Sequence, residues 1–347
     1  MASLSSWLFG SPPPEGRGDS DEKKKDKARR LSLRKISILV IDSGKQSSDW
    51  KAVFNGIEFK ERALQVVQCA WDEFHIMSDG PYSRTPCIIS VLVEVEPHKP
   101  KRVVSLKPDF VLVRNEVRSL DQDYRNKLYG LMYANIPSVN SLSSIYMCLE
   151  RPIVQGQLNK LASLHGDKFR LVPQSYFASH RDFFYGNTFP AVVKVGSAHA
   201  GYGKMKVHNH KDMEDFKSVL AVAGKYCTAE PFIEGKFDLR IQKIGANYRA
   251  FKRVSVSGTW KTNTQTSHTE EIEMTDEYKF WADEAAKLFG GLDIVSVDAI
   301  HNSKDGKEYI MEINGTSSGL MPECTEQDNI HIRDVVLKKL EEVHSIV

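Results

Sequence analysis

The chain has 347 residues, and its 47 lysines and arginines nearly balance its 45 aspartates and glutamates. This length allows two domains with separate cores, and a net charge of +2 gives no electrostatic basis for a nucleic-acid-binding protein. No apolar run approaches the roughly 20 residues of a membrane-spanning helix. The five cysteines are scattered without a Cys-x-x-Cys pair, which favours a reducing, cytoplasmic setting.

Residues 1–33 are predicted to form a disordered tail, because their prolines, glycines and charges cannot build a core. Within this tail, Ser32 follows Arg29 and Arg30, and such a basic pair suits a basophilic protein kinase. Phosphorylation would place a charge of about −2 among basic neighbours. The alternative is a charged tail that is not modified.

Residues 34–140 alternate strand and helix patterns, which is typical of an α/β domain. The apolar run Ile36–Ile41 predicts a buried strand that enters a loop at Asp42. No catalytic cluster is visible here, so we expect this domain to contact a substrate or another subunit. Further strands are expected at 65–70, 88–94, 102–105 and 109–114, and a helix at 124–134.

Residues 141–347 carry the patterns of a second, α+β domain. A tight turn joins residues 238–245 to 248–256, and both arms alternate polar and apolar residues. This alternation predicts a hairpin with one covered face and one free face. Helices are expected at 150–165 and 211–222, and a further one is expected to begin at the N-cap residue Thr275.

The segment around Lys194 predicts a phosphate-binding loop. A β-branched strand delivers Lys194, a run of small residues follows, and Lys204 opens the next apolar stretch. Small residues let backbone N–H groups close on an anion, and the lysines supply positive charge. Because Met205 follows Lys204, this is not the G-x-x-x-x-G-K-[ST] loop. A glycine hairpin between two strands is the alternative.

Two late strands contain acidic residues. Asp298 lies within the apolar run 294–300, and Glu312 and Asn314 share one face of the run 309–314. A buried carboxylate stays charged only if it is paired or bound to a metal, and oxygen ligands suit Mg²⁺ or Ca²⁺. Either acid could pair with a lysine instead. Together, downstream of the lysine loop, they favour a metal–phosphate site.

The order of these features resembles the ATP-grasp superfamily, in which two α+β subdomains hold ATP between them. More narrowly, residues 34 to about 340 resemble the synapsins, a family of vesicle-associated neuronal phosphoproteins. This resemblance implies a pre-ATP-grasp α/β domain, followed by an ATP-grasp nucleotide-binding domain. The stretches that carry it are 107–112, 136–142, 198–204, 228–233 and 255–264.

The resemblance also implies roles for individual residues. Lys194 and Arg151 would reach the phosphates of ATP, and the loop Gly196–Lys204 would cover them. Asp238 would lie beside the ribose, and Asp298, Glu312 and Asn314 would hold the divalent ion. The other nucleotide-binding residues implied are His199, Gly201, Gly203 and Lys204 in the loop, Glu230, Phe232 and Ile233 at an adenine hinge, and Lys261 and Asn263 at the phosphate end.

Three departures from the synapsin pattern suggest an invertebrate-like or divergent member. Arg151 stands where a lysine is expected, and Asp298 where a glutamate is expected. Glu312-x-Asn314 keeps the general superfamily pattern, from which vertebrate synapsins have drifted. The choice between Mg²⁺ and Ca²⁺ therefore stays open.

Resemblance to this family implies a cytoplasmic phosphoprotein that binds ATP with a divalent cation. It would associate peripherally with synaptic vesicles at the presynaptic terminal, regulate neurotransmitter release and form a homo-oligomer, a dimer or a tetramer. An active ATP-grasp carboxylate–amine ligase is the alternative, because the same ATP site serves both. A scaffold with a vestigial ATP site is a third reading, which the presence of Lys194, Asp298 and Glu312 opposes.

Overall fold

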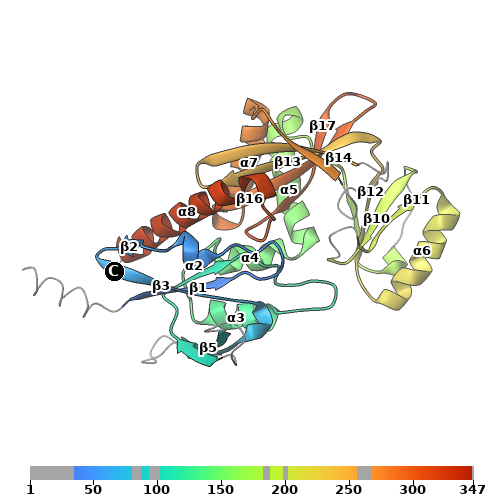
Figure 1. Ribbon diagram of the computed structural model, residues 1–347. Coiled ribbons are helices and arrows are strands. Elements are labelled where there is room, and N and C mark those ends of the chain that lie inside the picture. The colour runs from blue at the N-terminus through green and yellow to red at the C-terminus, as the bar shows by residue number, and fades with distance from the viewer. Residues whose placement is uncertain are drawn as a thin grey trace, which may run out of the picture.

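The computed structural model describes residues 35–79, 87–93, 102–182, 188–197, 202–255 and 267–345. Two five-stranded sheets form the body of the protein, and a long helix, α8 (Thr325–Ser345), runs between them (Figure 1). A four-stranded sheet with helix α6 (His210–Ala223) stands to one side. The predicted order of an α/β domain followed by an α+β domain is present.

The first sheet has the strand order β2-β3-β1-β7-β8, and β1 runs parallel to both β3 and β7. Strand β1 is buried on both faces, as its continuous apolar sequence predicts. Leu39 and Ile41 point to one core, and Ile36, Ile38 and Val40 point to another. The strands are β1 (Ile36–Ile41), β2 (Glu58–Phe59), β3 (Arg62–Cys69), β7 (Phe110–Val113) and β8 (Ser138–Val139).

One face of this sheet is covered by helices α3 and α4 and by a three-stranded antiparallel sheet. The expected strands at 88–94 and 102–105 and the expected helix at 124–134 are present within one to two residues. The elements are β4 (Phe74–Ser78), β5 (Cys87–Val93), β6 (Arg102–Leu106), α3 (Arg125–Tyr133) and α4 (Leu142–Cys148), with the short α2 (Trp50–Val53) on the other face.

The second five-stranded sheet is antiparallel, in the order β15-β14-β13-β16-β17. Helices α5 (Arg151–His165) and α7 (Asp276–Ala286) pack on one face, where Trp281 is fully buried. Thr275 accepts a hydrogen bond from the N–H of Tyr278, as its predicted N-cap role requires. The strands are β13 (Gly235–Ile244), β14 (Asn247–Ser255), β15 (Ser267–Ile272), β16 (Ile294–Asn302) and β17 (Glu308–Asn314).

The second face of the β13–β14 hairpin is not free, contrary to the sequence prediction. Gln242 is only 3% exposed, and its Nε2 donates to Asp328 Oδ2 on α8 at 2.7 Å. Arg249 donates to the other oxygen of the same carboxylate at 2.9 Å. The polar face of the hairpin therefore binds helix α8 through hydrogen bonds. A pattern of alternating polar and apolar residues cannot distinguish such a face from one that contacts water.

Helix α8 joins the two sheets through one shared core. Ile332 and Val336 are fully buried and pack with Ile38 of β1 and with Ile294 of β16. The Asn140 side chain also links the two domains. Its amide oxygen accepts from Ile294 N at 2.9 Å, and its amide nitrogen donates to Ile294 O at 2.7 Å. The two predicted domains are therefore closely packed against each other.

The four-stranded sheet has the order β11-β10-β12-β9, and α6 packs against one of its faces through Phe216 and Leu220. Asn209 caps α6 by accepting from Asp212 N, and Gly224 ends the helix in the left-handed conformation. The strands are β9 (Ser175–Phe177), β10 (Ala191–Val195), β11 (Lys204–Val207) and β12 (Cys227–Pro231).

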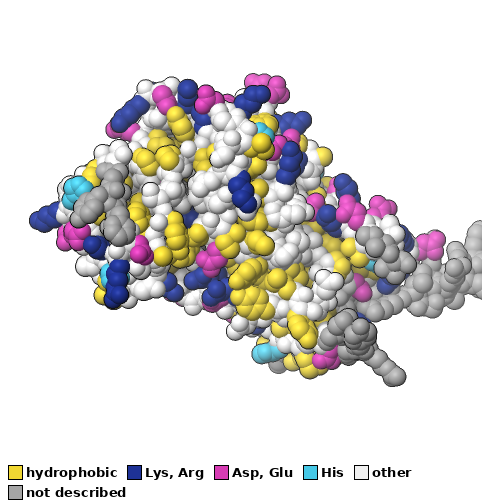
Figure 2. Space-filling view, turned by 180° about the vertical axis from the view of Figure 1, so that it is seen from behind, with side chains coloured by type: hydrophobic (Ala, Val, Ile, Leu, Met, Phe, Trp, Pro, Cys, Tyr) yellow, Lys and Arg dark blue, Asp and Glu magenta, His cyan; other side chains and the backbone are white. Residues whose placement is uncertain are grey.

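Cationic and anionic side chains alternate over the face of the molecule shown in Figure 2, with hydrophobic side chains between them. This mixture matches the near-zero net charge of the sequence. Among the described residues, no helix is both long enough and apolar enough to cross a membrane.

Candidate functional site

The face of the small sheet opposite α6 carries three lysines. Lys194 of β10 lies beside Lys204 of β11, and Lys206 follows two residues later on the same face. The alternate residues of β10, including Val193, point to the α6 core. The period of two in these strands therefore separates a cationic face from an apolar one.

Lys194 is the most buried of these lysines, with a side chain that is 4% exposed. Its Nζ lies 2.6 Å from Glu230 Oε1, and Gln174 Nε2 donates to Glu230 Oε2 at 2.9 Å. Burial lowers the pKa of Lys194, and although the attraction of Glu230 opposes this effect, the pKa stays below its usual value. In the described part of the chain, Glu230 is thus the carboxylate that forms an ion pair with this buried ammonium group.

Two buried polar atoms beside this pair have no hydrogen-bond partner among the described residues. They are Thr228 Oγ1, directly across from Lys194 in the strand pairing, and Gln174 Oε1. A buried polar group without a partner costs about 1–3 kcal/mol. A polar ligand that reached this face would give both atoms a partner, which fits a nucleotide.

The segment after β12 is where the sequence predicts an adenine hinge. Phe232 N donates to Pro190 O at 2.8 Å, so this N–H is already used inside the protein. Lys206 Nζ lies 3.5 Å from the centre of the Phe232 ring. Ile233 is half-buried. An adenine base would therefore have to bind backbone N–H and C=O groups of the hinge other than the N–H of Phe232.

The facing wall is built from β16 and β17, which place Asp298 directly opposite Glu312. Asp298 is 1% exposed, and Arg240 donates to both of its oxygens at 2.9 Å. Asn314 Nδ2 also donates to Asp298 Oδ2, at 3.2 Å. Burial by itself raises the pKa of Asp298, but Arg240 and Arg253 outweigh it and hold the pKa below its usual value.

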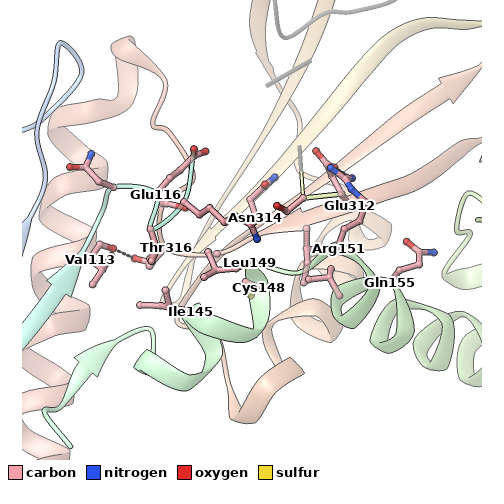
Figure 3. Close-up of a pocket in the computed structure, with 18 of the residues that line it drawn as sticks. Val113, Glu116, Ile145, Cys148, Leu149, Arg151, Gln155, Glu312, Asn314 and Thr316 are labelled. Atoms are coloured by element: carbon pink, nitrogen blue, oxygen red, sulfur yellow. Dashed lines mark hydrogen bonds and ion pairs between the residues drawn. The ribbon is translucent and has the colours of Figure 1, made fainter. Parts of the chain in front are cut away.

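Glu312 points toward Arg151 at the start of α5, and its Oε2 accepts from Arg151 Nη1 at 2.9 Å (Figure 3). The Glu312 side chain is 25% exposed. Burial again acts to raise its pKa, but Lys204, Arg151 and Lys194 together bring the pKa well below the usual range of a glutamate. The positive charges of the small sheet therefore act on an acid of the large sheet, and Ser197, which follows β10, lines one cavity with Glu312.

A cavity of about 140 Å³ adjoins this acid. Glu312, Asn314 and Arg151 form its polar side, and Ile145 and Leu149 belong to its apolar side (Figure 3). Thr316 closes one end, where its hydroxyl donates to Val113 O at 2.7 Å. Glu312 and Asn314 thus have space for a small group next to them.

The residues predicted to bind a metal are brought together. Asp298, Glu312 and Asn314 offer two carboxylates and one amide, and Mg²⁺ in nucleotide sites is typically held by one or two carboxylates with phosphate oxygens and water. The donor set therefore fits Mg²⁺ with a nucleotide. It is sparse for an ion held by protein alone: in the described part of the chain, no three His, Cys, Asp or Glu side chains gather as a metal site.

The charge of the two acids does not by itself require a metal, because Arg240 and Arg151 already pair with them.

The remaining predicted site residues lie as follows. Asp238 is half-buried on β13, opposite Arg253 of β14, on the same strand face as Arg240. Two glycines of the predicted loop, Gly196 and Gly203, have positive φ angles of 52° and 62°. His199, Gly201, Lys261, Asn263 and Ser32, which were also predicted as site residues, lie outside the described residues.

Three further residues at the site were not predicted from the sequence as site residues: Gln174, Lys206 and Arg240. The spacing of Lys206 from Lys204 is a usable signal, since residues two apart in a strand share a face. Arg240 alternates with Asp238 in the same way. Gln174 lies just before β9, and no sequence pattern around it indicates its hydrogen bond with Glu230.

Sequence comparison agrees with this geometry. Residues 32–138 match the synapsin pre-ATP-grasp domain, and residues 140–342 match the synapsin ATP-binding domain. The chain belongs to the synapsin family. Synapsin of Drosophila melanogaster is 34% identical over 314 residues, which are 89% of this chain and 30% of that protein. The chain thus spans about a third of the length of this relative.

Solved structures of ATP-grasp enzymes share the fold. D-alanine–D-alanine ligase from Bacillus anthracis, complexed with ATP, superposes with a TM-score of 0.56 at 16% identity, over 89% of this chain and 99% of that one. The ATP-grasp ligase PsnB, in a complex with Mg and ADP, gives 0.57 at 16% identity, over 88% and 99%. At these identities the likeness concerns the fold alone.

Proposed function

We propose that this protein is a synapsin-type regulator that binds ATP with a divalent cation in the cleft between the small sheet and the second five-stranded sheet. The observation that carries the proposal is the buried Lys194, which is held by Glu230 and whose charge helps to lower the pKa of Glu312. Arg151 and Lys204 add positive charge for phosphates, and Asp298, Glu312 and Asn314 would hold the ion. The ion would neutralise phosphate charge.

The test of the nucleotide site is the affinity of Lys194→Ala for ATP, measured by calorimetry with Mg²⁺ and, separately, with Ca²⁺. Loss of a hydrogen bond to a charged group predicts binding weaker by about 1.5–3 kcal/mol. Lys211→Ala is the matched control, because Lys211 is an exposed lysine on α6, on the other side of the same sheet. Unchanged affinity in a folded Lys194→Ala protein would refute the site.

The two-carboxylate donor set supports Mg²⁺ over Ca²⁺, because Ca²⁺ takes about 6–8 oxygen ligands and Mg²⁺ shares its shell with phosphates and water. The double variant Asp298→Asn, Glu312→Gln should lose metal-dependent ATP binding. Circular dichroism establishes whether it is folded. If metal-dependent binding persists, the ion is held elsewhere.

Family membership and the tail sequence support a role on vesicles. We expect peripheral association with synaptic vesicles in the presynaptic cytoplasm, homo-oligomer formation and regulation of neurotransmitter release. Basic residues of the tail would contribute about 1 kcal/mol each on an anionic surface. Phosphorylation of Ser32 by a basophilic kinase would weaken that contact.

Vesicle co-sedimentation of unmodified and Ser32-phosphorylated protein, at low and at physiological salt, tests this role. Phosphorylation should release the protein and leave ATP affinity unchanged, because Ser32 precedes residues 34–347. Equal sedimentation at both salt concentrations would exclude an electrostatic switch.

A carboxylate–amine ligase is the second candidate, and the cavity beside Glu312 and Asn314 favours it. An acceptor carboxylate there would lie next to the phosphate end of the cleft. ADP release that depends on an added carboxylate and an added amine would support this activity. ATP binding without such release would favour the regulatory role.

A further inference from the structure

A second and larger cavity lies where the two domains meet, at the carboxyl ends of two parallel strands of the first domain. Its volume is about 420 Å³, within the range of roughly 300–1,000 Å³ that is typical of small-molecule sites. The loops after β1 and β7 form one side, and the loop after β17 forms the other. None of its lining residues was predicted as a site residue.

The position of this cavity is the one at which parallel sheets bind ligands. Strand β3 pairs with one edge of β1, and β7, which comes later in the chain, pairs with the other edge. The strand order therefore reverses between β1 and β7. Loops that leave the carboxyl ends of two such strands diverge and open a crevice. Asp42 and Arg114, the residues that follow β1 and β7, both line the cavity.

The lining is hydrophilic, which sets the class of ligand. Five serines line the cavity, and Leu320 is its one apolar side chain among the residues described. Sites for apolar ligands have mostly hydrophobic and aromatic walls. The hydroxyls of Ser43, Ser47 and Ser48 donate to Asn115, to Gly44 O and to Asn329, so they are left to accept hydrogen bonds from a ligand. Such acceptors, together with the amide of Gln46, suit a ligand that carries several hydroxyl groups.

Two of the three charged groups in the cavity hold the loops in place. Asp42 Oδ2 accepts from Trp50 Nε1 at 2.6 Å, and Arg114 donates through one nitrogen to Thr316 O and through the other to Ser318 O at 2.8 Å. Both side chains are buried, whereas Lys45 is exposed. The three charges sum to +1, and Lys45 is the cation able to meet a ligand.

We propose that this crevice binds a small polyhydroxylated anion of the sugar-phosphate class, with the anionic group at Lys45 and the hydroxyl groups on the serine-lined walls. This site is distinct from the ATP cleft. Asn115 and Ser317 line both this crevice and the cavity beside Glu312, so its occupant would lie next to the phosphate end of the nucleotide site.

Calorimetry on the full chain with glucose 6-phosphate tests the proposal, with glucose and inorganic phosphate as separate arms. We expect a dissociation constant of about 1 mM or tighter for glucose 6-phosphate, and binding weaker by about tenfold or more for each fragment. Absence of binding by glucose 6-phosphate would overturn the proposal. Equal binding by inorganic phosphate would overturn the role of the hydroxyl groups.

Gly319→Leu provides a steric test, because a Cβ at Gly319 meets no atom within 4 Å and would project from a residue that lines the crevice. This variant should weaken glucose 6-phosphate binding by about tenfold or more. Gly156→Leu is the matched control: Gly156 has equally open space, is exposed on α5 and lines neither cavity. Unchanged binding in Gly319→Leu would overturn the site.

Lys45→Glu is the second variant, at an exposed loop position where folding is not at risk. Reversal of this charge should abolish binding of glucose 6-phosphate. Lys194→Ala should bind it as the unmodified chain does. Loss of binding in Lys194→Ala, with binding retained in Lys45→Glu, would place the anion in the ATP cleft and overturn the proposal.

Discussion

The two walls of the proposed nucleotide site stabilise buried charge to different extents. On the small sheet, Lys194 forms an ion pair with Glu230, but burial prevails, so that the pKa of Lys194 is lowered. On the large sheet, guanidinium groups surround Asp298 and prevail over burial, so that its pKa is lowered as well. A lowered pKa destabilises the charged form of a lysine and stabilises that of an aspartate. Asp298 is thus stabilised in its charged form, and Lys194 is destabilised in its charged form.

Removal of Arg240 should have the largest effect. Arg240→Met leaves Asp298 buried without its bidentate partner, and breaking a buried ion pair costs about 3–5 kcal/mol. Urea unfolding followed by circular dichroism measures the change. The double variant Arg240→Met, Asp298→Leu is the control and should recover most of the loss, because no charge is left buried. A single variant as stable as the unmodified protein would show that Arg253 and Asn314 suffice for Asp298.

Loss of the partner on the lysine wall should have a smaller effect. Glu230→Gln removes the negative charge beside Lys194, but this lysine can release its proton, so we expect a loss of about 2 kcal/mol. The folded-state pKa of Lys194 lies below the unfolded value near 10.4, so the unfolded state binds more protons between the two values. The stability of the variant should therefore rise with pH through this window. A flat profile would show that Lys194 does not titrate differently in the two states.

The acidic wall should show a dependence of the same sign, but at lower pH. The pKa of Glu312 is lower in the folded protein than the unfolded value of about 4.3, so its contribution is present above that pH and is lost as the pH falls toward the folded value. Unfolding free energies measured from pH 5 to pH 3 should fall more steeply for the unmodified protein than for Glu312→Gln. Parallel curves would mean that Glu312 gains nothing from its cationic neighbours.

The smallest effect is expected for an ion pair of similar geometry outside the cleft. Lys252 Nζ lies 2.9 Å from Glu270 Oε1 across β14 and β15, but both side chains are exposed to water. Water screens such pairs, so Lys252→Met should leave the midpoint of urea unfolding unchanged within error. A clear shift would show that geometry rather than burial sets the strength of ion pairs on this sheet.

The sequence was most informative in strands, where residues two apart lie on the same face. It placed Lys194 at a strand end and Glu312 and Asn314 on one strand face, and the structure brings these residues together with Asp298. Arg151 was predicted to reach phosphates, but its pairing with Glu312 was not predicted. Arg240 was missed because its pairing with Asp298 depends on which strands become neighbours. The predicted free face of the hairpin was wrong for the same reason.

Helix α8 was not predicted, although Ile332, Val336 and Leu340 have a helical spacing. Polar residues on both sides of this stripe weaken the pattern, and two of them, Asp328 and Asn329, are buried. Asp328 pairs with Gln242 and Arg249, and Asn329 accepts from Ser48, so neither contact can be read from local sequence.

The location of α8 has a consequence for synthesis of the chain. Ile36, Ile38 and Val40 are translated long before α8, the helix that covers them. One side of the nascent first sheet therefore stays uncovered until residues 325–345 have emerged. During that interval the exposed apolar strand is open to chaperones and to aggregation, and the shared core can close only after translation of residues 325–345.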